Sequence, residues 1–325
     1  MTTNEVDIRE DFLLQLGADV LQKLLIDHTT RQNIFWATDS YADRGEGYAY
    51  ADQITVERIT GANGCVVQPR AVKARDEQTR RTKGRAEVFT PSWVCNAQNN
   101  LVDDAWFGRP GVFNIEDADA HTWRATSRPV EFPEGKTWRD YVRDIRLEVA
   151  CGEAPYLVSR YDTVTGEPIP LAERIGLLDR KLRVVSENTN TSGEWLDWAK
   201  LALMATYGFE WQGDNLLLAR EAALMTFAEH YEAKFGKAPL PKSFAHAAYI
   251  ISWNIFQMDG IKCVIPDSCH PTVTVGLFGE ETITPCPGCK EGGHKGHTGI
   301  RVMVKDWGVK NKEEQKIYFT DLMRP

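Results

Sequence analysis

Apolar residues recur at helical spacing in several parts of the chain. A broad apolar face through residues 8–25 predicts one amphipathic helix, and the same spacing predicts helices over 171–185, 194–206 and 215–233. The apolar run from Ile145 to Val149 is short and has strand character. Strands that alternate with helices predict an α/β fold.

The segments between these elements are less regular. Residues 32–68 are expected to be partly β, and residues 261–265 are a further candidate for a buried strand. The step Thr90-Pro91-Ser92 predicts a helix start, with Thr90 as the cap and Pro91 at the first helical position. Near the C-terminus, residues 299–305 and 317–319 predict closing strands.

Composition narrows the class of protein. The chain has 325 residues, 42% hydrophobic and 26% charged, which is ordinary for a globular protein of one large domain or two. No apolar run is long enough to cross a bilayer, and the acidic N-terminus is unlike a signal peptide, so we expect a cytoplasmic protein without membrane contact. The net charge of −8 argues against coating nucleic acid with the whole surface, so any DNA contact must be local. Seven cysteines, an odd number, favour reduced thiols and a metal site over disulfides.

One stretch breaks its strand pattern with small residues. After the run ending at Val149 come Ala150, Cys151 and Gly152, and an apolar segment from Tyr156 could open a helix. Small residues between a strand and a helix let a ligand touch the backbone. A tight turn in any α/β domain would look the same.

This stretch resembles the first cofactor motif of the S-adenosylmethionine-dependent DNA amino-methyltransferases. The match is carried by Ala150, Cys151, Gly152, Tyr156 and Leu157, while Glu148 stands where the family has its leading acid. The resemblance implies that Glu148 and the segment from Ala150 to Gly152 bind the cofactor.

Three further segments resemble cofactor motifs of the same family. Phe89-Thr90-Pro91 is similar to the motif that lines the methionine and carboxylate end of the cofactor. By resemblance, Glu210 binds the ribose hydroxyls, Trp211 packs on the adenine, and Asp259 accepts from the adenine amino group. Without the resemblance, Glu210 is a surface acid beside a core tryptophan, and Asp259 caps a turn.

The family's catalytic motif is missing from this sequence. Amino-methyltransferases carry D/N/S-P-P-aromatic, and no such tetrapeptide occurs here. Residues 266–271 lie roughly where it should be. Within them, Asp267 could accept from an exocyclic amine and His270 could stack on a flipped base, although their spacing differs from the motif. Asp267 is our catalytic candidate.

A basic stretch precedes these motifs. Such clusters neutralise phosphates, although a solvated basic surface is the commoner explanation. The candidate DNA-binding residues are Arg70, Lys73, Arg75, Arg80, Arg81, Lys83 and Arg85.

A cysteine–histidine cluster predicts a structural zinc site. Cys286-Pro-Gly-Cys289 is a knuckle that aims two thiolates at one point, and His297 follows closely. For the fourth ligand, His294, Cys269 and Cys263 are all candidates, and we favour Cys269 because it would join the tail to the core. The alternative is a glycine-rich loop with unligated thiols.

The sequence therefore predicts an α/β fold. We expect a Rossmann-like methyltransferase sheet in residues 86–268, an N-terminal extension in 1–85 and a small zinc-binding appendage in 269–325. The resemblance implies S-adenosylmethionine-dependent methylation of adenine N6 in DNA, within restriction–modification or phage defence, with a restriction or specificity subunit as a further partner. The alternatives are a catalytically inactive subunit that binds cofactor or DNA, and an RNA methyltransferase.

Overall fold

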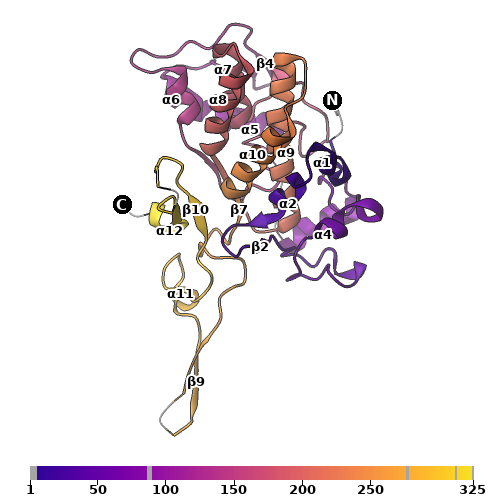
Figure 1. The fold of residues 1–325 in the computed structure, drawn as a ribbon, viewed down its shortest axis with the longest axis vertical. Coiled ribbons are helices and arrows are strands. Elements are labelled where there is room, and N and C mark those ends of the chain that lie inside the picture. Colours follow the sequence, from indigo (N-terminus) through magenta and orange to yellow (C-terminus); the bar gives the residue numbers. More distant parts are fainter. Residues whose placement is uncertain (1–5, 86–89, 276–277, 312, 324–325) are drawn as a thin grey trace.

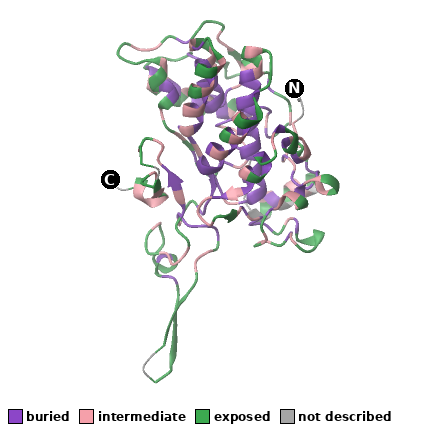
Figure 2. Cartoon of the chain, viewed as in Figure 1, coloured by how far each residue is buried: buried purple, intermediate pink, exposed green. Residues whose placement is uncertain are grey.

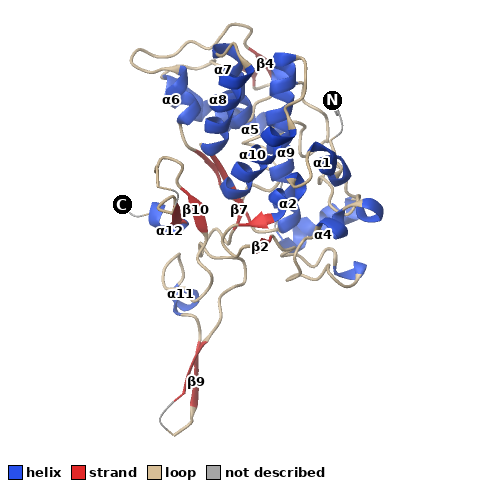
Figure 3. Ribbon diagram, in the orientation of Figure 1, coloured by secondary structure: helices blue, strands red, loops and turns tan. Residues whose placement is uncertain are grey.

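The computed structural model describes residues 6–85, 90–275, 278–311 and 313–323 as a mixed α/β protein with small sheets (Figure 3). The helices are α1 (Glu10–Leu16), α2 (Val20–Leu25), α3 (Val56–Ile59), α4 (Arg75–Arg85), α5 (Ser92–Phe107), α6 (Trp138–Arg143), α7 (Leu177–Asn188), α8 (Ser192–Met204), α9 (Gly213–Phe235), α10 (Pro241–Asn254), α11 (Pro287–Glu291) and α12 (Phe319–Leu322). The strands are β1 (Ile26–Asp27), β2 (Gln32–Asn33), β3 (Asn114–Asp117), β4 (Thr122–Ala125), β5 (Arg146–Glu148), β6 (Thr206–Glu210), β7 (Ile255–Gln257), β8 (Thr272–Val275), β9 (Glu281–Thr284), β10 (Met303–Lys305) and β11 (Lys316–Tyr318).

The central sheet is parallel, with strand order β5-β6-β7 among the described residues. Helices α7 and α8 connect β5 to β6, and α9 and α10 connect β6 to β7. Glu148 pairs with Gly208, and Glu210 pairs with Gln257. Glu148 and Glu210 are the last residues of β5 and β6. Because the strands run parallel, both residues lie at the carboxyl edge of the sheet, where ligands bind in α/β proteins.

Helix α9 forms the centre of the hydrophobic core. Its residues 213–231 are all buried, as expected for a helix that is covered on every side. It packs against α2, α7, α8 and α10, which Figure 2 shows as a mostly purple interior. Apolar residues from the N-terminal 67 residues belong to the same cluster, so this segment shares one core with the helices around the sheet.

Arg220 of α9 ties the N-terminal segment to the sheet. Its fully buried guanidinium donates hydrogen bonds to the carbonyl oxygens of Leu24, Ile26, Ser252 and Ile255. Such a buried cation is tolerated because several of its N–H groups find acceptors.

The C-terminal segment covers the opposite face of the sheet. Phe209 and Phe256 pack there against Val302 and Val304, in a second and smaller cluster. Strands β10 and β11 pair antiparallel, which confirms the predicted closing strands. The β8–β9 hairpin projects away from the rest of the chain, and the residues of its two strands are exposed (Figures 1 and 2).

Residues 32–68 contain the strand β2 and the helix α3, in agreement with the expectation that they are only partly β. Two other predictions of local structure were wrong. The predicted helix 8–25 is divided between α1 and α2, because Gly17 has an extended backbone (φ 163°, ψ 146°) that ends α1. Residues 261–265 form a turn, because the Asp259 carboxylate accepts the N–H groups of the two residues that follow Gly260. Among the described residues, none of the helices is long and apolar enough to cross a membrane.

Candidate functional site

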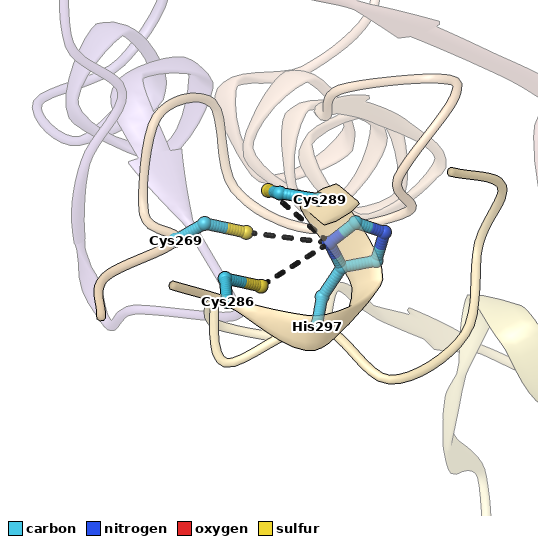
Figure 4. Close-up of side chains that lie close together, drawn as sticks. All are labelled: Cys269, Cys286, Cys289 and His297. Atoms are coloured by element: carbon cyan, nitrogen blue, oxygen red, sulfur yellow. Dashed lines mark hydrogen bonds between the residues drawn. The ribbon is translucent and has the colours of Figure 1, made fainter. Parts of the chain in front are cut away.

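Four side chains that bind metals well converge in the C-terminal part of the chain (Figure 4). Cys269 follows β7, Cys286 and Cys289 lie at the start of α11, and His297 lies in the loop after it. The three sulfur atoms lie 3.5, 3.7 and 3.7 Å from Nδ1 of His297. A tetrahedral zinc site with Zn–S of about 2.3 Å and Zn–N of about 2.0 Å has S···N edges of about 3.5 Å. The group could therefore hold a metal such as zinc.

Neighbouring groups orient these ligands. Nε2 of His297 lies 2.8 Å from the carbonyl oxygen of Gly293, so Nε2 carries the proton and Nδ1 is left as a donor to a metal. Hydrogen bonds from Thr298 lower the pKa of Cys286 to about 5, which favours the thiolate. An added Cβ at Gly288 would lie 2.8 Å from the His297 ring, so only glycine fits between the two cysteines of the knuckle.

The predicted ligand set is confirmed as a cluster. Cys269 joins the knuckle as expected, and its ligand atom and those of the other three lie within 4.8 Å of one another. Of the alternatives, Cys263 is buried with its sulfur 3.7 Å from that of Met323. His294 does not belong to the group.

A second cluster lies at the carboxyl ends of β5 and β6. The Glu148 carboxylate accepts from the N–H groups of Tyr156 and Leu157, and the Glu210 carboxylate accepts from the N–H of Gly152 at 2.9 Å. Burial raises the pKa of Glu148 well above its usual value and also raises that of Glu210, while these backbone hydrogen bonds act in the opposite direction. The structure thus brings the predicted acids and the small-residue turn together.

The turn itself differs from the prediction. No helix follows Cys151 across the described residues 152–170, so the expected helix N-terminus is absent from this turn. Ala150, Gly152 and Ala154 have φ of 50°, 54° and 60°, a conformation that a helix does not use. With these three residues outside the right-handed helical region, the segment forms turns instead of a helix. Cys151 is buried, 3.3 Å from where a Cβ on Gly208 would lie.

Thr90 and Pro91 lie beside this turn. The carbonyl oxygen of Thr90 accepts a hydrogen bond from the Thr163 hydroxyl, and the Thr90 side chain lies near the hydroxyl of Tyr156. Helix α5 begins one residue later than predicted, because the Asp162 carboxylate, rather than Thr90, caps it by accepting the Ser92 N–H at 2.7 Å. Phe89 lies outside the described residues.

Trp211 and Asp267 are linked by a residue that the sequence did not single out. The Trp211 indole N–H donates to the Tyr50 hydroxyl at 3.1 Å, and that hydroxyl donates to the Asp267 carboxylate at 2.5 Å. Asp267 is exposed and has φ of 52°, an uncommon conformation for a residue other than glycine. No local pattern around Tyr50 indicates this contact, because its partners lie 161 and 217 residues away.

Asp259 caps a turn. It is buried, its Oδ1 accepts the N–H groups of Ile261 and Lys262, and its Oδ2 lies 3.3 Å from the Lys262 ammonium. These contacts match the alternative interpretation of Asp259.

The basic stretch is partly internal, which corrects its interpretation as a DNA-binding surface. Lys73 and Arg81 are buried and lie 3.3 and 2.7 Å from the Asp214 carboxylate, so they neutralise an internal acid and cannot reach phosphates. Arg75 and Lys83 are exposed on α4, and Arg70 is half-buried. The side chains of Arg80 and Arg85 lie outside the described part of the chain.

In comparisons with known proteins, no family model, no curated protein and no solved structure matches this chain.

Proposed function

We propose that this chain binds S-adenosylmethionine at the carboxyl edge of its parallel sheet and takes part in adenine-N6 methylation of DNA. The observation that carries the proposal is the convergence of Thr90, the 150–154 turn and Glu210, which lie far apart in the sequence. Ligand sites in α/β sheets occupy this edge. The proposal treats β5, β6 and β7 as the first half of a Rossmann-like sheet.

The side chains at this edge fit part of the cofactor. Glu210 offers a carboxylate for the ribose hydroxyls, and Trp211 follows it on the chain. Because the Gly152 N–H is engaged by Glu210, cofactor binding requires one of the two to exchange partners. Ala150 has φ of 50°, a strained conformation for a residue other than glycine, and strain of this kind is common at ligand sites. When bound, the cofactor supplies an electrophilic methyl group.

Asp267 is the residue proposed to hold the target amine. Its carboxylate faces solvent, and the hydrogen bond from Tyr50 fixes it beside Trp211. An ionised carboxylate accepts hydrogen bonds from an exocyclic amine, which would orient the nitrogen for direct attack without a covalent enzyme intermediate. Cys269 lies two residues further on, so a structural zinc ion would also restrain Asp267.

A second candidate function is a cofactor- or DNA-binding subunit without catalysis of its own. The observation in its favour is the sequence, which contains no pair of adjacent prolines and hence no D/N-P-P-aromatic tetrapeptide. A restriction or specificity subunit would then supply the missing chemistry. The exposed Arg75 and Lys83 are the remaining candidates from the basic stretch for phosphate contact.

Calorimetry and methyl transfer test both candidates. Glu210→Gln should weaken binding of S-adenosylmethionine at least about tenfold, because a charge-assisted hydrogen bond contributes about 1.5–3 kcal/mol. The matched control, Glu134→Gln, removes an exposed acid and should leave affinity unchanged. Absence of cofactor uptake by the wild-type protein would refute both forms of the proposal that involve cofactor.

Incorporation of a labelled methyl group separates the candidates. Transfer to adenine-containing DNA by the isolated chain supports the enzyme, and Asp267→Asn should abolish it while cofactor affinity is kept. Uptake of cofactor without transfer supports the inactive subunit. Transfer to RNA but not to DNA would identify the acceptor as RNA.

A further inference from the structure

A pocket lies beside the β3–β4 hairpin, at the end of the molecule opposite the metal cluster (Figure 1). Its volume is about 530 Å³, which is within the range of about 300–1,000 Å³ that small-molecule sites occupy. The walls come from the segment between α5 and β3, from the hairpin itself, and from the loop that follows β4, residues 126–131. None of the residues proposed to bind the cofactor or the target amine lines this pocket.

Three arginines line the pocket. Arg109 follows α5, Arg124 belongs to β4, and Arg128 lies in the loop after β4. All three are exposed, and none forms an ion pair with a carboxylate of the described residues. The lining contains one acid, Glu131, whose carbonyl oxygen rather than its carboxylate accepts from Arg109 at 3.0 Å. Cations gathered around one pocket repel one another, and an anion placed there is attracted by all of them.

The nearby acids outside the lining have other partners. The Glu173 carboxylate accepts the N–H of Ala125 at 3.1 Å. The Glu187 carboxylate pairs with Arg183 at 2.8 Å through one oxygen and accepts the N–H of Val130 at 2.8 Å through the other. These two acids therefore hold the walls in place and leave the charge of the three arginines uncompensated.

The loop that carries Arg128 is fixed, although it has no helix or strand. The Arg183 guanidinium of α7 donates to the carbonyl oxygens of Phe113, Thr126 and Arg128, at 3.1, 2.9 and 3.0 Å. The Thr126 hydroxyl donates in turn to the Val112 carbonyl at 2.9 Å, which joins the loop to the opposite wall. Walls that are already in place reduce the entropy that a ligand loses by ordering them.

Part of the pocket is apolar. Val112 and Val130 are buried, and Ile115 on β3 is 56% exposed. Ile115 lies directly opposite Arg124 in the β3–β4 pair, so an apolar surface adjoins a guanidinium. A ligand that matches this combination has an anionic group joined to a less polar part.

We propose that this pocket binds a phosphate ester of nucleotide size. The phosphate lies among the guanidiniums of Arg109, Arg124 and Arg128, and the organic part lies against Ile115. Guanidinium groups match phosphate oxygens with two parallel hydrogen bonds, which an ammonium cannot do. A free mononucleotide and the backbone of a nucleic acid share this chemistry. S-adenosylmethionine carries no phosphate, so this proposal and the proposed cofactor site can fail separately.

Calorimetry with the full-length protein tests the ligand class. The probes are adenosine monophosphate, adenosine, inorganic phosphate, and a short DNA in single-stranded and duplex form. A phosphate ester should bind more tightly than inorganic phosphate, and adenosine should not bind. Binding of adenosine monophosphate without binding of DNA identifies a mononucleotide site. Binding of DNA with an affinity that falls as salt rises identifies the nucleic acid backbone as the source of the phosphate.

Protein variants locate the site. Arg124→Met and Arg128→Met should each weaken binding of the ester at least about tenfold, because each removes charge-assisted hydrogen bonds. Arg124→Lys keeps the charge but loses the paired hydrogen bonds, so its affinity should lie between those of the wild type and Arg124→Met. The matched control is Arg44→Met, which removes an exposed arginine outside the pocket and should bind normally.

A further variant tests the apolar wall. Ile115→Thr keeps a β-branched residue on β3 and should weaken binding of the ester several-fold, while binding of inorganic phosphate stays unchanged. Urea unfolding of each variant shows whether the fold is retained.

Three results would overturn the proposal. If adenosine bound as tightly as adenosine monophosphate, the pocket would not recognise phosphate. If Arg44→Met weakened binding as much as Arg124→Met, the attraction would come from the charge of the whole surface. If no phosphate ester bound, or if Arg124→Met and Arg128→Met bound it as well as the wild type, the three arginines would not form a phosphate site.

Discussion

The buried charges around Asp214 allow a quantitative test of how the N-terminal segment is held. Asp214, at the start of α9, lies 2.7 Å from Arg81 and 3.3 Å from Lys73, and it accepts a hydrogen bond from the Tyr41 hydroxyl. All three charged side chains are at most 2% exposed. The perturbation is Asp214→Asn, which keeps the shape of the side chain and removes its charge.

The expected loss follows from these distances. At an effective dielectric constant of about 20, two unit charges about 3 Å apart attract by about 5–6 kcal/mol, most of which offsets the cost of desolvation. Removing one partner of a buried ion pair typically costs about 3–5 kcal/mol. Because two cations lose one anion here, we expect a loss of about 4–5 kcal/mol in the free energy of unfolding.

Equilibrium unfolding in urea at pH 7 measures this loss. The control is Asp197→Asn, which breaks the exposed pair with Lys200 and should cost less than about 1 kcal/mol. Adding Arg81→Met to Asp214→Asn should recover part of the stability, since it removes one of the two buried cations that face residue 214. A loss for Asp214→Asn no larger than that of the control would refute the argument.

The pH dependence gives a second check. Although burial raises it, the pKa of Asp214 is held well below its usual value by Arg81 and Lys73. A carboxyl with a lowered pKa stabilises the fold above its unfolded value of about 3.9, and this stabilisation is lost as the pH falls towards the folded pKa. The difference between wild type and Asp214→Asn should therefore be constant from pH 5 to 8 and shrink below about pH 4.

Three further predictions concern other parts of the molecule. Burial raises the pKa of Glu10 to about 8. Between about pH 4.5 and 8 the unfolded state therefore releases a proton that the folded state keeps. The free energy of unfolding of the wild type should fall in this range, and Glu10 should contribute at most about 1.4 kcal/mol per pH unit. Glu10→Gln should reduce that slope in urea titrations, while Glu148 and Glu210, whose pKa values burial also raises, still contribute to it; an unchanged slope would contradict the assignment. A Cβ at Gly213 would lie 2.1 Å from the Phe35 carbonyl oxygen, so Gly213→Ala should lower the free energy of unfolding by about 2 kcal/mol or more. The control is Gly193→Ala on α8, where the space around the Cβ is open. This change should be neutral or should stabilise α8 by up to about 1 kcal/mol. If both alanine variants changed the urea midpoint equally, the backbone near Phe35 would have moved to make room for the new Cβ, and the prediction would be wrong. Elemental analysis should find one zinc per chain, lost in Cys289→Ser but not in Cys65→Ser, an exposed cysteine outside the cluster; zinc retained by Cys289→Ser would exclude the site.

The sequence by itself determined elements whose signals are local. Helix α8, strand β5 and the closing strands follow from the spacing of apolar residues over a few turns or residues. The metal cluster could also be foreseen, because a C-x-x-C turn places two thiolates together whatever surrounds it, and Cys269 was favoured for joining the tail to the core. The apolar run that predicted β5 did not show which strands it pairs with in the sheet.

Only the tertiary structure decided the fate of the charged residues. Lys73 and Arg81 lie in a basic run that local pattern assigns to the surface, but their partner Asp214 is 141 and 133 residues away, and pairing with it makes their burial possible. Likewise, the turn after β5 was expected to start a helix, but its backbone has positive φ at Ala150, Gly152 and Ala154 and closes as turns around the buried Glu148 carboxylate. The spacing of apolar residues shows which face of a helix or strand is apolar. It does not show which distant group pairs with a buried charge or accepts a hydrogen bond from a backbone N–H. Such long-range contacts position Lys73, Arg81 and the turn after β5.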